Sequence, residues 1–210
     1  MTPHAKKSRP SQKPLARGLP SLKLVRTDRV VKGADASGPE PSPLPGSSVG
    51  PGLSQQVEPF TAIARDLPPL FERHWQELGT HKDQIPLDPD WDRYFLLAQT
   101  GTLRVRTARV DGVLAGYIFN LVGPGLHYRS TLHAEIEMFW LDPVYRGMGV
   151  VGMNHWFVSD WFRDNDEDLR ALGVKRISVA VKNGYRDGRV AVVFKRLGYL
   201  PIETVMSKVL

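Results

Sequence analysis

The chain has 210 residues, 41% of them hydrophobic, which is enough for one buried core with an appendage. It contains no cysteine, and this excludes disulfides, thiolate metal sites and a cysteine nucleophile. The formal net charge is +6, and the whole excess lies in residues 1–56, which hold nine Lys/Arg against three Asp/Glu.

Residues 1–56 are expected to form a disordered basic tail. Gly33–Gly52 is rich in Pro, Gly and Ser and has little to bury, as is typical of a disordered linker. A solubilising extension is one interpretation. Two others stay open: weak binding to nucleic acid or another acidic partner, because clustered Lys/Arg attract phosphate, and docking of Ser21–Val31 onto another protein chain. No apolar run is long enough to span a membrane or resembles a secretory signal, so we expect no membrane partner.

Two helices are predicted after the tail. The first, Thr61–Gly79, has apolar residues at helical spacing and is expected to break near Pro68 and Pro69. The second, Asp88–Gly101, begins with a capping Asp and an early Pro and ends at Gly.

Alternating strands and further helices follow. Leu103–Gly123 predicts two strands joined by a tight turn at Asp111 and Gly112. A charged run, Arg163–Arg170, is expected to be a solvated helix face. The remaining predicted elements are a strand at Ser130–Leu141, a helix from near Val150 to Gly173, a strand at Val174–Asn183, a helix at Arg186–Gly198 and a last strand at Pro201–Leu210. The sequence of residues 57–210 therefore predicts one α/β domain with a mixed sheet.

A glycine-rich turn, Arg146–Gly152, lies between a predicted strand and a predicted helix. The N-terminus of a helix has unpaired N–H groups and partial positive charge, and glycines let a ligand approach them. Arg146 adds a charged donor. This arrangement suits a phosphate group, but the sequence has no Gly-Lys-Ser/Thr and no parallel βαβ series, which argues against a nucleoside triphosphatase and a dinucleotide fold.

The segment "LDPVYRGMGV", Leu141–Val150, resembles the acetyl-CoA-binding motif of the GNAT superfamily of N-acetyltransferases. "VVFKRLGY", Val192–Tyr199, is similar to the family's C-terminal helix segment. The resemblance covers about Thr61–Leu210. Glu72–Tyr94 together with Leu126–Glu135 also looks like GNAT proteins encoded by tailed bacteriophages. The implied fold is α/β, with a GNAT-like, mostly antiparallel mixed sheet flanked by helices.

The resemblance also implies a site for acetyl-CoA as acyl donor, without a metal. Backbone amides after Arg146 would receive the pyrophosphate, and the end of the preceding strand would pair with the pantetheine arm. Val151 stands where the family has a small residue, and Asp187 where members often have Asn. The expected cofactor-binding residues are Trp140, Leu141, Arg146, Gly147, Met148, Gly149, Val150, Val151, Gly152 and Asp187.

Two carboxylates are candidates for the catalytic base. An amine arrives as an ammonium and must lose a proton before it attacks a thioester. Strand alternation places Glu135 and Glu137 on one face. The resemblance puts Glu135 where many members carry a catalytic Glu, while Glu137 lies nearer the cofactor. A third interpretation is that both are ordinary carboxylates that face solvent and have no catalytic role. Phe194 stands where the family commonly has a tyrosine acid, and Tyr185, Tyr145, Tyr128 or water are the open alternatives for that proton donor.

The implied function is acetyl transfer from acetyl-CoA to a primary amine of a small molecule or protein by direct attack, in the cytoplasm (the host cytoplasm or the virion for a phage protein). Val151, Asp187 and Phe194 favour an alternative, a catalytically weak or inactive GNAT-fold structural or interaction protein such as a phage virion component. A nucleic-acid-associated protein acting through its tail is a second alternative.

Overall fold

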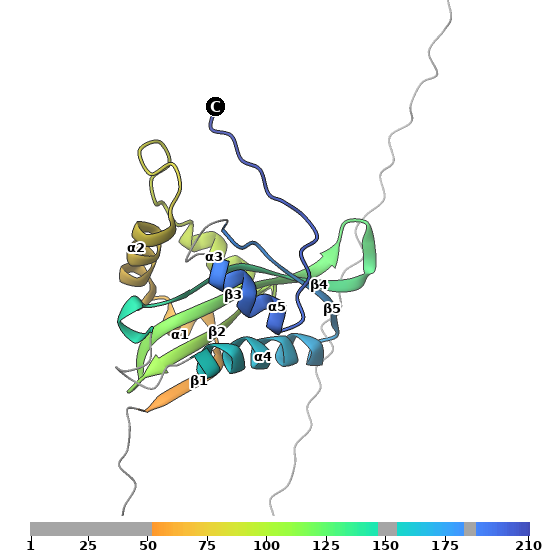
Figure 1. Cartoon of the computed structure of the whole chain (residues 1–210), viewed down its shortest axis with the longest axis horizontal. Coiled ribbons are helices and arrows are strands. Elements are labelled where there is room, and N and C mark those ends of the chain that lie inside the picture. Colours follow the sequence, from red (N-terminus) through yellow and green to blue (C-terminus); the bar gives the residue numbers. More distant parts are fainter. Residues whose placement is uncertain (1–51, 147–154, 183–187) are drawn as a thin grey trace, which may run out of the picture. The chain divides into compact units, whose positions relative to one another are not determined.

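The computed structural model describes residues 52–146, 155–182 and 188–210, which lie in one compact unit, Gly46–Leu210. Its centre is a five-stranded sheet in the order β1-β2-β3-β4-β5 (Figure 1). Neighbouring strands pair antiparallel except β4 and β5, which are parallel. The predicted class, a mixed and mostly antiparallel sheet flanked by helices, is confirmed. The strands are β1 Leu53–Glu58, β2 Leu103–Val110, β3 Val113–Gly125, β4 Tyr128–Leu141 and β5 Val174–Val179.

Strand β1 corrects the predicted boundary of the tail. The sequence analysis extends the tail to residue 56, but Leu53 already pairs with Val110 of β2. With two Gln and one Ser among its six residues, β1 has little β-propensity of its own. Its place depends on the ladder to β2 and on contacts such as the 2.7 Å hydrogen bond from Gln55 Nε2 to Asp164 Oδ2.

The predicted hairpin between β2 and β3 is confirmed. Asp111 and Gly112 have φ values of 49° and 80°, the left-handed conformations that a two-residue hairpin turn needs. Asp111 Oδ1 also accepts a 2.7 Å hydrogen bond from the backbone N–H of Gly52, so the turn binds the residue that directly precedes β1.

Three helices cover one face of the sheet, here called the front face. They are α1 Phe60–Ile63, α2 Leu67–Leu78 and α3 Trp91–Gln99. The first predicted helix breaks at residues 64–66, and Pro68 and Pro69 lie in the first turn of α2, where a missing N–H costs nothing. Asp90, rather than Asp88, caps α3 by accepting from the backbone N–H of Arg93 at 2.9 Å. The front core includes Ile63, Leu67, Phe71, Tyr117 and Phe119.

Helices α4, His155–Ala171, and α5, Arg189–Arg196, cover the opposite face, here called the back face (Figure 1). Trp161 and Phe162 of α4 pack with Phe194 of α5 against apolar residues of the sheet. The start of the predicted helix near Val150 lies outside the described residues. Gly173 and Gly198 follow the two helices with φ values of 90° and 91°, as expected for glycines that end a helix.

The charged run Arg163–Arg170 corrects the prediction of a solvated helix face. Asn165 and Leu169 are buried, and Asp168 binds Arg106 of β2 at 2.5 Å. The side chain of Arg106 is only 8% exposed, so the acidic residues of α4 neutralise a cation on the back face of the sheet. Only part of the run is solvated: Arg163, Glu167 and Arg170 are exposed, whereas Asp164 and Asp168 face arginines of the sheet.

We expect Asn165→Ala to lower the free energy of unfolding by about 1–3 kcal/mol. Asn120 and Asn165, 1% and 2% exposed, exchange hydrogen bonds of 2.8 and 3.2 Å between β3 and α4. The substitution leaves the buried Asn120 oxygen without this donor. Urea denaturation measures the change, and Glu167→Ala, at an exposed position of the same helix, is the control. Equal stability of the two variants would contradict the prediction.

The predicted last strand, Pro201–Leu210, is wrong. No residue in this described segment is in a strand, and the side chains of Ile202, Val205 and Met206 are 65%, 80% and 86% exposed. The segment is rich in β-branched residues, which favour a strand, but its apolar residues do not alternate, and a strand also needs a neighbour for its backbone hydrogen bonds. The segment runs away from the sheet (Figure 1).

The predictions for residues 1–51, including Ser21–Val31, lie outside the described residues. Within the part of the chain that is described, no helix has the length and apolar character needed to cross a membrane.

Candidate functional site

The sheet opens where β4 continues beyond β5. The β4–β5 ladder ends at the pair Ile136 and Val179, whereas β4 stays paired with β3 as far as Leu141. No described strand therefore lies beside Glu137–Leu141 on the β5 side. The backbone groups of such an edge can pair with an extended ligand that carries amides, apart from the Leu141 oxygen, which accepts from Arg146 Nε.

A bulge lies at the start of this open edge. Phe119 is opposite Met138 and Asn120 is opposite Ile136, so Glu137 is an extra residue in β4. Farther along, a Cβ on Gly116 would lie 2.7 Å from the backbone oxygen of Trp140, so glycine permits the close approach of β3 and β4 there.

A turn after β4 is held by Asp142. Its backbone N–H bonds to Ala115 at 2.9 Å, and its carboxylate accepts from the N–H of Val144 at 3.1 Å. The same carboxylate binds Arg73 of α2 at 2.7 Å. A 3-10 helix, Pro143–Tyr145, then leads to Arg146.

Arg146 is bound by Glu77, which lies in the last turn of α2. Its guanidinium contacts both carboxylate oxygens, with Nη2 2.7 Å from Oε2, and its Nε donates to the backbone oxygen of Leu141. Glu77 also accepts a 2.8 Å hydrogen bond from the indole of Trp140. Arg146 lies over the Trp140 ring at 5.6 Å, a cation–π distance. The predicted residues Trp140, Leu141 and Arg146 are thus brought together.

His74 packs against this cluster from α2. Its ring stacks on Trp140 with centroids 5.8 Å apart, and Nδ1 is 2.8 Å from the Tyr117 hydroxyl. Burial lowers the pKa of His74 to about 4, with Arg146 and Lys182 adding to the effect and Glu77 opposing it. His74 is therefore neutral at neutral pH. Burial also lowers the pKa of Lys182.

Glu135 lines an open pocket of about 360 Å³ at the front face, between β3, β4 and β5. His133 of β4 and Arg176 and Ser178 of β5 line the same pocket. A carboxylate here can accept a proton from a bound amine, and the pocket is wide enough for a small acceptor group.

Glu137 lies nearer α3. Burial and then the charge of Glu137 raise the pKa of Tyr94, an α3 residue that packs on the front core. Glu137 does not line the pocket that holds Glu135.

Phe194 cannot donate a proton, and its surroundings are apolar. It is 3% exposed and makes edge contacts with Phe139, Phe162 and Tyr199. The phenol of Tyr199 is itself bound to Asp166 at 2.7 Å.

The other predicted site residues lie outside the described parts of the chain. They are Gly147, Met148, Gly149, Val150, Val151, Gly152 and Asp187.

Sequence reasoning missed the α2 side of the site, namely Arg73, His74 and Glu77. One signal was present: His74 continues the apolar stripe of Leu67, Leu70 and Phe71, and a histidine in such a stripe indicates a buried polar contact. Nothing local indicates Glu77, because its partners lie more than 60 residues away.

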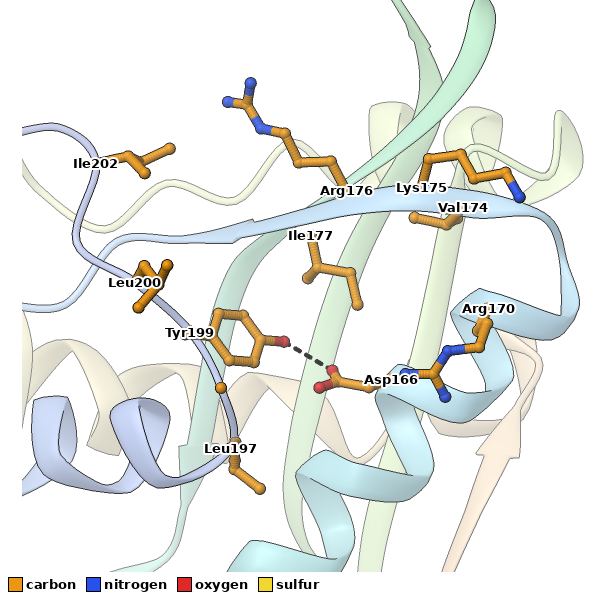
Figure 2. A pocket seen from close by; sticks show the side chains of 11 residues that line it. Asp166, Arg170, Val174, Lys175, Arg176, Ile177, Leu197, Tyr199, Leu200 and Ile202 are labelled. Carbon is orange, nitrogen blue, oxygen red and sulfur yellow. Dashed lines mark hydrogen bonds between the residues drawn. The ribbon is translucent and has the colours of Figure 1, made fainter.

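A second pocket, of about 420 Å³, lies beside β5, α4 and the C-terminal segment. Figure 2 shows the Tyr199 hydroxyl directed at Asp166, with Arg170 close by. Burial raises the pKa of Asp166, although the bond from Tyr199 opposes this effect. None of the predicted site residues lines this pocket. Among the residues described, no group of three His, Asp or Glu is placed to hold a metal ion.

Comparisons with known proteins indicate the family and the fold. Residues 62–199 match the family described as acetyltransferase (GNAT) family. No curated protein sequence matches closely enough to count as a relative.

Several solved structures share the fold. An aminoglycoside acetyltransferase, HMB0005, from an uncultured soil metagenomic sample is 11% identical with a TM-score of 0.57, over 75% of this chain and 97% of that one. A ribosomal-protein-alanine N-acetyltransferase from Brucella melitensis biovar Abortus 2308 is 14% identical with a TM-score of 0.53, over 76% and 99%. A predicted acetyltransferase with acetyl-CoA from Clostridium acetobutylicum is 11% identical with a TM-score of 0.52, over 75% and 96%.

Proposed function

We propose that this chain, which belongs to the acetyltransferase (GNAT) family, transfers an acetyl group from acetyl-CoA to a primary amine. The observation that carries the proposal is the open edge of β4 at Glu137–Leu141, which leads directly to Arg146 and the glycine-rich turn. An extended pantetheine arm carries amides that can pair with such an edge.

The residues around this edge fit the charge of the cofactor. Around Trp140 and His74, the three cations Arg73, Arg146 and Lys182 outnumber the two carboxylates that pair with the arginines. Positive charge favours the pyrophosphate of acetyl-CoA. Arg146 and Trp140 would hold the cofactor's phosphate end, and the backbone of β4 would hold its arm.

Acetyl-CoA supplies the acetyl group as a thioester. Glu135 accepts the proton of the acceptor ammonium, and the freed amine nitrogen attacks the thioester carbonyl. A C–N bond forms and the C–S bond breaks. The attacking nitrogen, which is positively charged after the attack, releases its second proton to water, and CoA leaves as a thiolate that takes a proton from solvent, because Phe194 has none to give. The acceptor is a primary amine, of a small molecule or a protein, that reaches the pocket beside Glu135 and Arg176.

We expect the purified chain to bind acetyl-CoA with micromolar affinity in isothermal titration, and Arg146→Ala to weaken binding about tenfold or more. Charge-assisted hydrogen bonds are worth about 1.5–3 kcal/mol, and each 1.4 kcal/mol is a factor of ten. The substitution removes a cation and frees the start of the glycine-rich turn from Leu141 and Glu77.

Arg163→Ala is the matched control, because it removes one positive charge from an exposed pair on α4. Its affinity should equal that of the wild type. An unmodified chain that binds no acetyl-CoA would contradict the proposed function and favour a structural or interaction role for the fold.

A further inference from the structure

We infer that Glu77 is a positioning residue for acetyl-CoA: its carboxylate fixes the Arg146 side chain and thereby the start of the glycine-rich turn. The inference rests on the proposed function, because it concerns how the same cofactor is held. Glu77 lies outside the glycine-rich motif, in the last turn of α2.

Glu77 joins three separate parts of the fold. From α2 it reaches the indole N–H of Trp140 at the end of β4 and the guanidinium of Arg146 beyond the 3-10 helix. The side chains of Glu77 and Arg146 are 22% and 16% exposed, so this pair is better shielded from water than a surface ion pair. A bidentate contact between a guanidinium and a carboxylate also sets the orientation of both groups.

The other contacts of Arg146 hold the backbone around it in place. Its Nε bonds to the backbone oxygen of Leu141, and its own N–H bonds to Pro143 at 3.1 Å. The ring of Trp140 supports the guanidinium from one side. With Glu77 as the further anchor, Arg146 is tied at its backbone and along its side chain at the point where the chain enters the glycine-rich turn.

Two physical effects of Glu77 oppose each other, and they predict opposite results. As a negative charge, Glu77 repels an anionic cofactor, so its neutralisation should tighten binding. As the anchor of Arg146, Glu77 holds that side chain in place before the cofactor binds. Binding then costs less conformational entropy, so neutralising Glu77 should weaken binding. Screening by water and salt weakens the repulsion, whereas the direct contacts are short and partly buried. The positioning effect is therefore the larger.

The test compares acetyl-CoA affinity, by isothermal titration of the full chain, for the wild type, Glu77→Gln, Arg146→Ala and the double variant. We expect Glu77→Gln to weaken binding about tenfold and to have no further effect when Arg146 is already Ala, because Glu77 acts through Arg146. Unchanged or tighter binding by Glu77→Gln, or independent losses that add in the double variant, would overturn the inference.

Glu72→Gln is the matched control. Glu72 is exposed on the same helix and accepts a 2.9 Å hydrogen bond from Gln76, so the same chemical change there should leave affinity unaltered. In steady-state assays, Glu77→Gln should raise KM for acetyl-CoA while kcat changes little, a split that general destabilisation would not produce.

Circular dichroism establishes that each variant is folded. If Glu77→Gln does not fold, Glu77→Asp keeps the charge but shortens the reach, and it should weaken binding by a smaller factor. Equal affinity of Glu77→Asp and the wild type would then overturn the inference. If the wild type binds acetyl-CoA and the Glu77 variant binds it equally well, only the inference about Glu77 is wrong. If the wild type does not bind acetyl-CoA, the proposed function is wrong as well.

Discussion

Glu135→Gln is expected to lower kcat/KM for acetyl transfer by about 10² to 10³ without changing acetyl-CoA affinity. A carboxamide has nearly the shape of a carboxylate but cannot accept the ammonium proton, and general-base catalysis typically contributes about 10²–10⁴. Glu135 lines the front pocket, away from the Arg146 cluster, so its loss should affect the chemical step and not cofactor binding.

Glu137→Gln distinguishes the two candidate bases. Glu137 lies at the β4 bulge near Tyr94 and outside the pocket that Glu135 lines, so we expect its substitution to cost much less. A greater loss in Glu137→Gln would assign the base to Glu137.

Trp161→Ala is expected to lower the free energy of unfolding by about 3–5 kcal/mol, a large part of the roughly 5–15 kcal/mol that holds a domain together. Trp161 is 1% exposed, and its ring packs beside Phe157 and Phe162 against the back face of the sheet. Removal of the indole leaves a cavity between α4 and the sheet. Chemical denaturation monitored by far-UV circular dichroism measures the loss.

Trp161→Phe is the control for this prediction. The indole N–H of Trp161 is buried and has no acceptor among the described residues, so phenylalanine loses some packing but no hydrogen bond within that part of the protein. We expect Trp161→Phe to be clearly more stable than Trp161→Ala. A Trp161→Ala variant within 1 kcal/mol of the wild type would show that the site closes around the cavity.

Much of the fold was predictable from short-range patterns. The turn at Asp111 and Gly112 needs two left-handed residues, and the sequence supplies Asp-Gly between two strand patterns. Gly173 and Gly198 mark the ends of α4 and α5 in the same way. The sequence motif also pointed to Trp140 and Arg146, which the structure brings together, and their role in binding a cofactor stays a prediction.

The errors arise where a partner elsewhere in the chain decides the structure. β1 has little β-propensity but pairs with β2, whereas Pro201–Leu210 is rich in β-branched residues and pairs with no described strand. Arg163–Arg170 resembles a solvated face because its charges are visible in the sequence and the arginine of β2 that they neutralise is distant.

By itself, the sequence determined the α/β class, the order of most helices and strands, the hairpin turn at Asp111 and Gly112 and the resemblance to the GNAT family, because these depend on periodicity, turn chemistry and motifs within a few residues. Only the tertiary structure shows that β4 extends beyond the end of β5 and that Glu77 binds Arg146, which is 69 residues away in the sequence. Strand pairing and buried ion pairs depend on which distant groups the fold brings within a few ångströms, and no local pattern encodes that distance.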